Sequence, residues 1–181
     1  SAASDVYKRQ LANIADLTIT TELGGSGAGN IAVNVPIAGT AGDGDDATDV
    51  TMTAGSGTIT IEDISTDIND VLLTSTGGIS LDGSITTAVD TDRTGTDESG
   101  VVTLTGPVTL AGNTTIDTDS TSNNGAVTFT STVDGAKTLT ITSGSGAVQF
   151  GGNIGATTAL GDVTVNSSAG TGAITFSGNV G

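Results

Sequence analysis

The chain has 181 residues, a formal net charge of -16, and neither cysteine nor histidine. Nucleic-acid phosphates and anionic lipid surfaces would repel so acidic a chain, so we expect no nucleic-acid partner. Without cysteine there is no disulfide framework and no thiolate metal site. No apolar run approaches the roughly 20 residues of a membrane span, so we expect no membrane insertion.

Threonine dominates the composition and favours extended backbone. The chain contains 35 threonines, and β-branched side chains are typical of strands rather than helices. Apolar positions recur at every second residue, as in half-buried strands. We therefore predict an all-β fold with little or no helix.

Residues 1–10 differ from the rest of the chain. They contain Lys8, Arg9 and the only tyrosine, Tyr7. The string SAASDVYKRQ resembles a translated sequencing adaptor, so we exclude residues 1–10 from the fold as a non-native or disordered tail. The same resemblance predicts a truncated reading frame.

Residues 11–56 carry an irregular version of the strand pattern. Segments 17–20 and 31–35 alternate apolar and polar residues, and stretches 24–27 and 39–46 are rich in turn-forming glycine and aspartate. We expect irregular solenoid coils here, with Gly- and Asp-rich loops.

One acidic stretch in this region is a candidate calcium site. Residues 42–46, with Asp49 beyond them, partly match the Gly-Gly-x-Gly-x-Asp repeat of calcium-binding β-rolls. Ala41 replaces the first glycine, Thr48 stands at an aliphatic position, and no tandem copy follows. A calcium-dependent extracellular module is thus one alternative function. The candidate ligands are Asp43, Asp45, Asp46 and Asp49.

Residues 57–181 repeat a short pattern, clearest at 125–129, 146–150 and 172–176, where Gly-small-aliphatic-polar-Phe is followed four residues later by Val or Ile. A glycine two residues before the first core aliphatic marks the phase. The interval between these glycines is the repeat length, and one repeat of that length is too short to bury an apolar face alone. The repeats therefore indicate a stacked array. The markers are Gly77, Gly100, Gly125, Gly146 and Gly172.

The 125–142 unit indicates which kind of array this is. Val127 and Phe129 share one face of a strand, Val133 turns inward after a bend, and Leu139 and Ile141 form a second inward pair. The unit predicts one coil of a parallel β-helix with rungs of about 20–26 residues. The unequal intervals between the marker glycines are then explained by loops at the corners of the coils, such as 86–99. The rival fold is a pair of immunoglobulin-like sandwiches, but those repeat near ~100 residues and pack a core tryptophan, which this chain lacks.

The predicted core consists of inward residues that stack from coil to coil. We expect the first set, Val127, Phe129, Val133, Leu139 and Ile141, to lie over Val148, Phe150, Ile154, Val163 and Val165. The third set is Ile174, Phe176 and Val180. The sequence stops inside a repeat, so we expect truncation at the C-terminus, flanking repeats of the same polypeptide, and end-to-end association of the isolated fragment.

Three strings within 125–155, Gly-Ala-Val-Thr-Phe, Thr-Leu-Thr-Ile and Gly-Gly-Asn-Ile-Gly, resemble the repeats of large bacterial exoproteins of the filamentous-haemagglutinin and autotransporter-passenger type. The resemblance covers about residues 50–181. It implies a right-handed β-helix shaft, export to a secreted or cell-surface location, and a role in adhesion, biofilm or surface structure. Host or matrix surfaces are the implied partners. It supplies no binding residues.

Catalysis is not expected. Outside residues 1–10 the only basic residues are Arg93 and Lys137. The pairs Asp90/Asp92 and Asp117/Asp119 have the residue types of a glycosidase, but such pairs in Thr/Ser/Gly loops are usually solvated corners. We assign no catalytic and no cofactor-binding residue. A spacer of a polysaccharide-active enzyme is a further alternative.

The last alternative is an ice-binding solenoid, which would use flat ranks of Thr-x-Thr. Outward strand positions favour threonine in any protein. A lattice match also demands an even period, which the unequal spacing of the marker glycines allows only if all variation lies in loops. The matching segments are 18–20, 51–53, 58–60, 103–105, 128–130 and 138–140.

Overall fold

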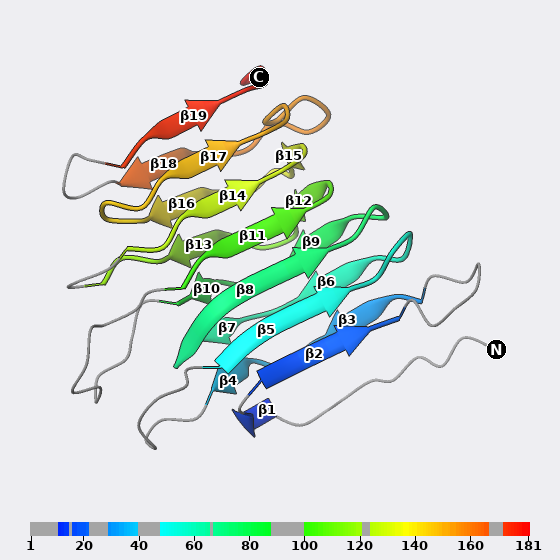
Figure 1. Cartoon of the computed structure of the whole chain (residues 1–181). Coiled ribbons are helices and arrows are strands. Elements are labelled where there is room, and N and C mark those ends of the chain that lie inside the picture. Colours follow the sequence, from blue (N-terminus) through cyan, green and yellow to red (C-terminus); the bar gives the residue numbers. More distant parts are fainter. Residues whose placement is uncertain are drawn as a thin grey trace.

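The chain forms a three-sided parallel solenoid (Figure 1). A computed structural model describes residues 11–14, 16–21, 29–39, 48–65, 67–87, 100–120, 124–166 and 172–181. Within these ranges every strand pairing is parallel and there is no helix. It follows that no helix in this part of the chain is long and apolar enough to cross a membrane. The prediction of an all-β parallel β-helix is confirmed.

Successive strands cycle through three sheets, so that neighbours in each sheet come from successive coils. Sheet A contains β1 (Leu11–Ile14), β4 (Ile37–Gly39), β7 (Ile64–Ser65), β10 (Ile85–Thr86), β13 (Thr114–Asp117), β16 (Leu139–Thr142) and β18 (Val163–Asn166). Sheet B contains β2 (Asp16–Thr20), β5 (Thr48–Thr53), β8 (Ile68–Thr74), β11 (Val102–Thr105), β14 (Val127–Phe129), β17 (Val148–Phe150) and β19 (Ile174–Phe176). Sheet C contains β3 (Ile31–Val33), β6 (Ile59–Ile61), β9 (Ile79–Leu81), β12 (Val108–Leu110) and β15 (Val133–Asp134), and single bridges at Ile154 and Val180 extend it.

The interior is a set of straight columns, in which the inward residue of one coil lies beside its register partner in the next. Phe129 pairs with Phe150, and Phe150 with Phe176. The first two rings stack with centroids 5.0 Å apart and planes 5° apart, and the third continues the stack at 5.1 Å and 3°. Columns form because side chains alternate along each strand while the coils stay in register.

The remaining predicted pairs follow the same register. The structure pairs Val127 with Val148, Leu139 with Val163, Ile141 with Val165, Val133 with Ile154, Val148 with Ile174, and Ile154 with Val180. The apolar columns therefore pass through the three clearest coils in the order that the sequence predicts.

Four predicted core positions are nevertheless exposed. β18 and β19 are the outermost strands of sheets A and B, so no described strand covers their far side. The sequence pattern predicts which residues belong to a column, but a residue is buried only where a coil covers it on each side. The exposed fractions are 37% for Val163, 42% for Ile174, 48% for Phe176 and 63% for Val180.

The coils are less even than the glycine markers predict. The last four markers precede strands of sheet B, but Gly77 precedes β9 in sheet C, so the predicted phase is wrong there. Register partners in sheet B can be as close in sequence as Val127 and Val148, or as far apart as Leu17 and Val50. Gly77 and Gly100 thus mark two different corners of the solenoid.

The marker glycines stand where adjacent coils touch through their backbones. A Cβ on Gly146 would collide with the carbonyl oxygen of Gly125, and a Cβ on Gly172 with the carbonyl oxygen of Gly146. Gly77 is confined in the same way by the carbonyl oxygen of Gly57. Close approach of two backbones therefore explains why glycine recurs at these positions.

Buried hydroxyls close the corner between sheets A and B. In each of three successive coils, a side chain that is at most 1% exposed donates to the carbonyl oxygen of the glycine preceding the next sheet B strand. The partners lie 13, 7 and 3 residues apart in sequence, so the same contact closes links of different length. The pairs are Thr87 with Gly100 at 3.0 Å, Thr118 with Gly125 at 2.7 Å, and Ser143 with Gly146 at 3.1 Å.

Truncating the middle ring of the phenylalanine stack should destabilise the solenoid. Phe150→Ala should lower the free energy of unfolding by roughly 3 to 5 kcal/mol, because the ring is fully buried between two others. Gln149→Ala is the matched control, since its side chain is exposed on the same strand, and it should change stability by less than about 0.5 kcal/mol. Urea unfolding followed by circular dichroism measures both. Equal stability of the two variants would contradict the stacked core.

Removing one corner hydroxyl should also destabilise the fold. Thr118→Val keeps the side-chain shape but leaves the Gly125 carbonyl without its hydroxyl donor, at a cost of about 1 to 3 kcal/mol. Thr115→Val, at an exposed position of β13, the strand that Thr118 directly follows, should be close to neutral. A urea midpoint for Thr118→Val no lower than that of Thr115→Val would show that the corner contact adds no stability.

Candidate functional site

The calcium candidate is only partly within the described residues. Asp43, Asp45 and Asp46 lie outside them, and Asp49 lies on β5. Asp49 Oδ1 accepts hydrogen bonds from the backbone N–H of Asp70 at 3.1 Å and from Nδ2 of Asn69 at 3.2 Å. This carboxylate therefore binds the next coil. No three acidic side chains in the described ranges are grouped to hold a metal ion.

Only one of the two carboxylate pairs considered for catalysis lies within the described residues. Asp90 and Asp92 lie outside the described residues. In the second pair, the backbone N–H of Asp119 donates to Oδ1 of Asp117 at 3.1 Å. This contact is a turn in which an aspartate side chain receives an N–H two residues later. This contact shapes a corner at the end of β13.

The best-defined polar constellation is a chain of contacts between coils along the starting edge of sheet B. Asp16 Oδ1 accepts the backbone N–H of Asp49 at 3.2 Å, and Asp49 Oδ1 accepts that of Asp70. Asp70 Oδ1 in turn accepts the N–H of Val101 at 2.8 Å. Each aspartate directly precedes an inward aliphatic residue near the start of its strand, and each donor occupies the same place one coil later. Three carboxylates thus fasten four successive coils.

The same contact recurs at the starts of strands in the other two sheets. An Asp or Asn before the first inward residue accepts the N–H of the corresponding residue in the following coil. In sheet A the pairs are Asp63 with Ser84 at 2.7 Å and Asn113 with Thr138 at 3.2 Å. In sheet C they are Asn30 with Thr58 at 2.9 Å and Asn153 with Asn179 at 2.9 Å.

These contacts have one chemical cause. Most of the donating N–H groups lie just before a strand, and those of Asp49 and Asp70 lie near the start of one. There a side-chain oxygen takes the place of a backbone acceptor. An aspartate and an asparagine present the same Oδ1 geometry, which explains why both residues occur. The sequence pattern alone predicts solvated acidic corners, and the role of these side chains between coils is not part of that prediction. The signal was present, because an Asp or Asn stands directly before the inward aliphatic in Asp16-Leu17, Asp63-Ile64 and Asp70-Val71.

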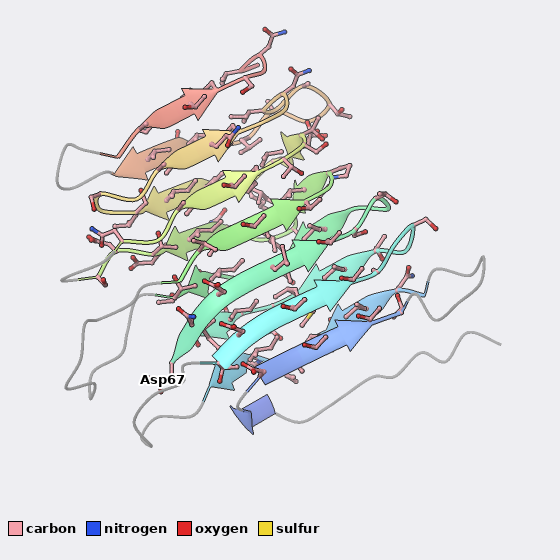
Figure 2. The ribbon with its side chains drawn as sticks, viewed as in Figure 1. Asp67 is labelled. Atoms are coloured by element: carbon pink, nitrogen blue, oxygen red, sulfur yellow. The ribbon has the colours of Figure 1, made fainter. Side chains whose placement is uncertain are left out.

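Asp67 lies in the short link from β7 in sheet A to β8 in sheet B (Figure 2). It is 8% exposed and has a φ of 51°, the only positive φ of a non-glycine residue in the described ranges. Its carbonyl oxygen accepts the N–H of Thr48 at 3.0 Å and would collide with a Cβ on Gly39. Aspartate tolerates this left-handed conformation better than most residues. Asp67 therefore has a structural role in turning the chain into β8.

Removing a side-chain oxygen that joins two coils should destabilise the fold, whereas replacing the carboxylate with an amide should not. Asp63→Ala leaves the Ser84 N–H without its acceptor and should lower the free energy of unfolding by about 1 kcal/mol. Asp63→Asn retains Oδ1, as the native Asn113 and Asn153 do, and should stay closer to the unmodified chain. Chemical denaturation measures both. If Asp63→Asn were as unstable as Asp63→Ala, carboxylate charge rather than the hydrogen bond would be the cause.

Comparisons with known protein families, with curated proteins and with solved structures find no significant match to this chain. The parallel β-solenoid is therefore established from the pairing of its own strands.

Proposed function

We propose that this chain is a structural, non-catalytic shaft segment of a secreted or cell-surface bacterial exoprotein. The observation that supports it best is the continuity of the core. Fully buried apolar residues follow one another in sheet B from Met52 through Leu73, Leu104 and Phe129 to Phe150. Such a core extends by adding coils and gives a rod whose length depends on the number of repeats.

The outward surface is consistent with this role. Strand positions that face away from the core carry mainly threonine, serine and alanine, and the acidic side chains before them are used to join coils. The resemblance of residues 125–155 to filamentous-haemagglutinin and autotransporter-passenger repeats suggests export and adhesion to host or matrix surfaces. The Asp117 and Asp119 contact gives no support to a polysaccharide-cleaving site.

Under a stretching force, a shaft segment should unfold one coil at a time. With the whole chain pulled from its ends in an optical trap, we expect successive extensions, each releasing one coil, because each repeat contacts only its neighbours. A short coil such as Val127 to Val148 releases about 70 Å of contour length. A single all-or-none extension of the whole chain would contradict a modular rod.

Location can be tested separately. Antibodies raised against the purified chain should label intact, unpermeabilised cells of the organism that carries this sequence, or detect the protein in its culture medium. Labelling that appears only after permeabilisation would overturn the surface role.

A further inference from the structure

The outward side of sheet B carries two parallel columns of threonine. Alternate residues of each strand point outward, and the coil-to-coil register aligns them with their equivalents in neighbouring strands. Across β2, β5, β8, β11 and β14 we call these residues the threonine face. They are Thr18, Thr20, Thr51, Thr53, Thr74, Thr103, Thr105 and Thr128, together with Thr130, which directly follows β14 and donates its N–H to the carbonyl oxygen of Leu104.

The threonine face is regular although the coils are unequal. From Thr51 onward the outward residues pair one to one in every strand of sheet B, through Thr103 and Thr128. The additional residues of the longer coils lie in links between sheets. Figure 1 shows the sheet B arrows stacked with closely similar directions. The condition that the ice-binding alternative required, with all variation in loops, is therefore met on this one face.

The hydroxyls of the threonine face differ from the other threonine hydroxyls. Corner threonines such as Thr21, Thr87 and Thr118 donate to backbone carbonyl oxygens. Within the described part of the chain, the only side-chain hydrogen bond on the threonine face joins Thr130 Oγ1 to the N–H of Gly106 at 3.2 Å. The other hydroxyls are open to a partner outside the molecule. Figure 2 shows short side chains, many with an oxygen atom, along the sheet B strands.

The face is also uncharged, although the chain carries a net charge of -16. None of the residues in its two columns is acidic or basic, and the aspartates of sheet B stand at the strand starts, as Asp49 and Asp70 do. An uncharged face matches an uncharged partner. Stacking on sugar rings would require aromatic side chains, but Phe129 and Phe150 are buried in the core.

The spacing of the array points to the partner. Neighbouring strands place equivalent threonines about 4.8 Å apart, and alternate residues along a strand lie about 6.6 Å apart. This two-dimensional repeat is close to the oxygen repeat on faces of hexagonal ice. Each threonine offers a hydroxyl that hydrogen-bonds water and a methyl group that restricts the orientation of neighbouring water.

We propose that the threonine face is an ice-binding site. Waters held between the two columns join the crystal surface, and the adsorbed protein prevents further growth at the points of attachment. This inference does not depend on the proposed shaft role, because a stable rod without ice activity would leave that role intact.

One residue interrupts the columns and provides a gain-of-function test. Leu72 occupies the place of a threonine in β8 and is 40% exposed. Leu72→Thr restores the hydroxyl at the centre of the face. It should increase activity, whereas a purely structural sheet B would show no change in ice growth.

The experiment measures thermal hysteresis of the whole chain and its incorporation into a slowly growing ice hemisphere. We expect hysteresis for the unmodified chain, more for Leu72→Thr, and loss of most of it for Thr103→Tyr, which places a ring in the middle of the face. The matched control is Thr140→Tyr, because Thr140 is similarly half-buried in an outward column of sheet A with Thr115 and Thr164.

Circular dichroism and urea midpoints confirm that the variants are folded, and Thr128→Ala replaces Thr103→Tyr if that chain does not fold. Absence of both hysteresis and incorporation in the unmodified chain would overturn the proposal. Equal losses in Thr103→Tyr and Thr140→Tyr would overturn it as well, since binding would then not belong to sheet B.

Discussion

A buried hydrogen bond at one corner, from a threonine or serine hydroxyl to a glycine carbonyl, is the contact on which the regularity of this solenoid depends. Between sheets A and B the chain inserts links of very different length. Three of these links return to the same place because the hydroxyl of Thr87, Thr118 or Ser143 binds the glycine two residues before the next sheet B strand. At Gly100 and Gly146 the glycine is needed because the backbone of the adjacent coil leaves no room for a Cβ. The long coil from Val71 to Val102 therefore stacks in the same register as the short coil from Val127 to Val148.

Register in turn determines the core. Once the corners align, each inward side chain lies beside the equivalent side chain of the next coil, and the thin interior becomes continuous columns of aliphatic and aromatic residues. The parallel rings of Phe129, Phe150 and Phe176 are the clearest case. A core so narrow has little redundancy, since each layer contributes few side chains and each side chain is covered mainly by the layers on either side.

The acidic residues have a more specific role than solvation. Where an Asp or Asn stands before the first inward residue of a strand, its Oδ1 accepts an N–H of the next coil, so the donor at Val101 or Ser84 is satisfied outside the regular ladder. These contacts place carboxylates at strand starts and leave the middle of sheet B to threonine. The same arrangement that joins the coils thus leaves an uncharged, evenly spaced face on a strongly acidic chain.

By itself the sequence determined the fold class, the inward and outward positions, and the stacking partners from Val127 to Val180, because alternation and repeat spacing are local properties of the chain. It did not distinguish Gly77 from Gly100, since both precede an aliphatic strand and only strand pairing assigns them to different sheets. Nor did it separate buried Thr118, with its corner role, from exposed Thr115, or show that Asp49 binds the next coil. The tertiary structure decided these points because each depends on contacts between residues in different coils or across a link, and the sequence spacing of those partners varies with the length of the link.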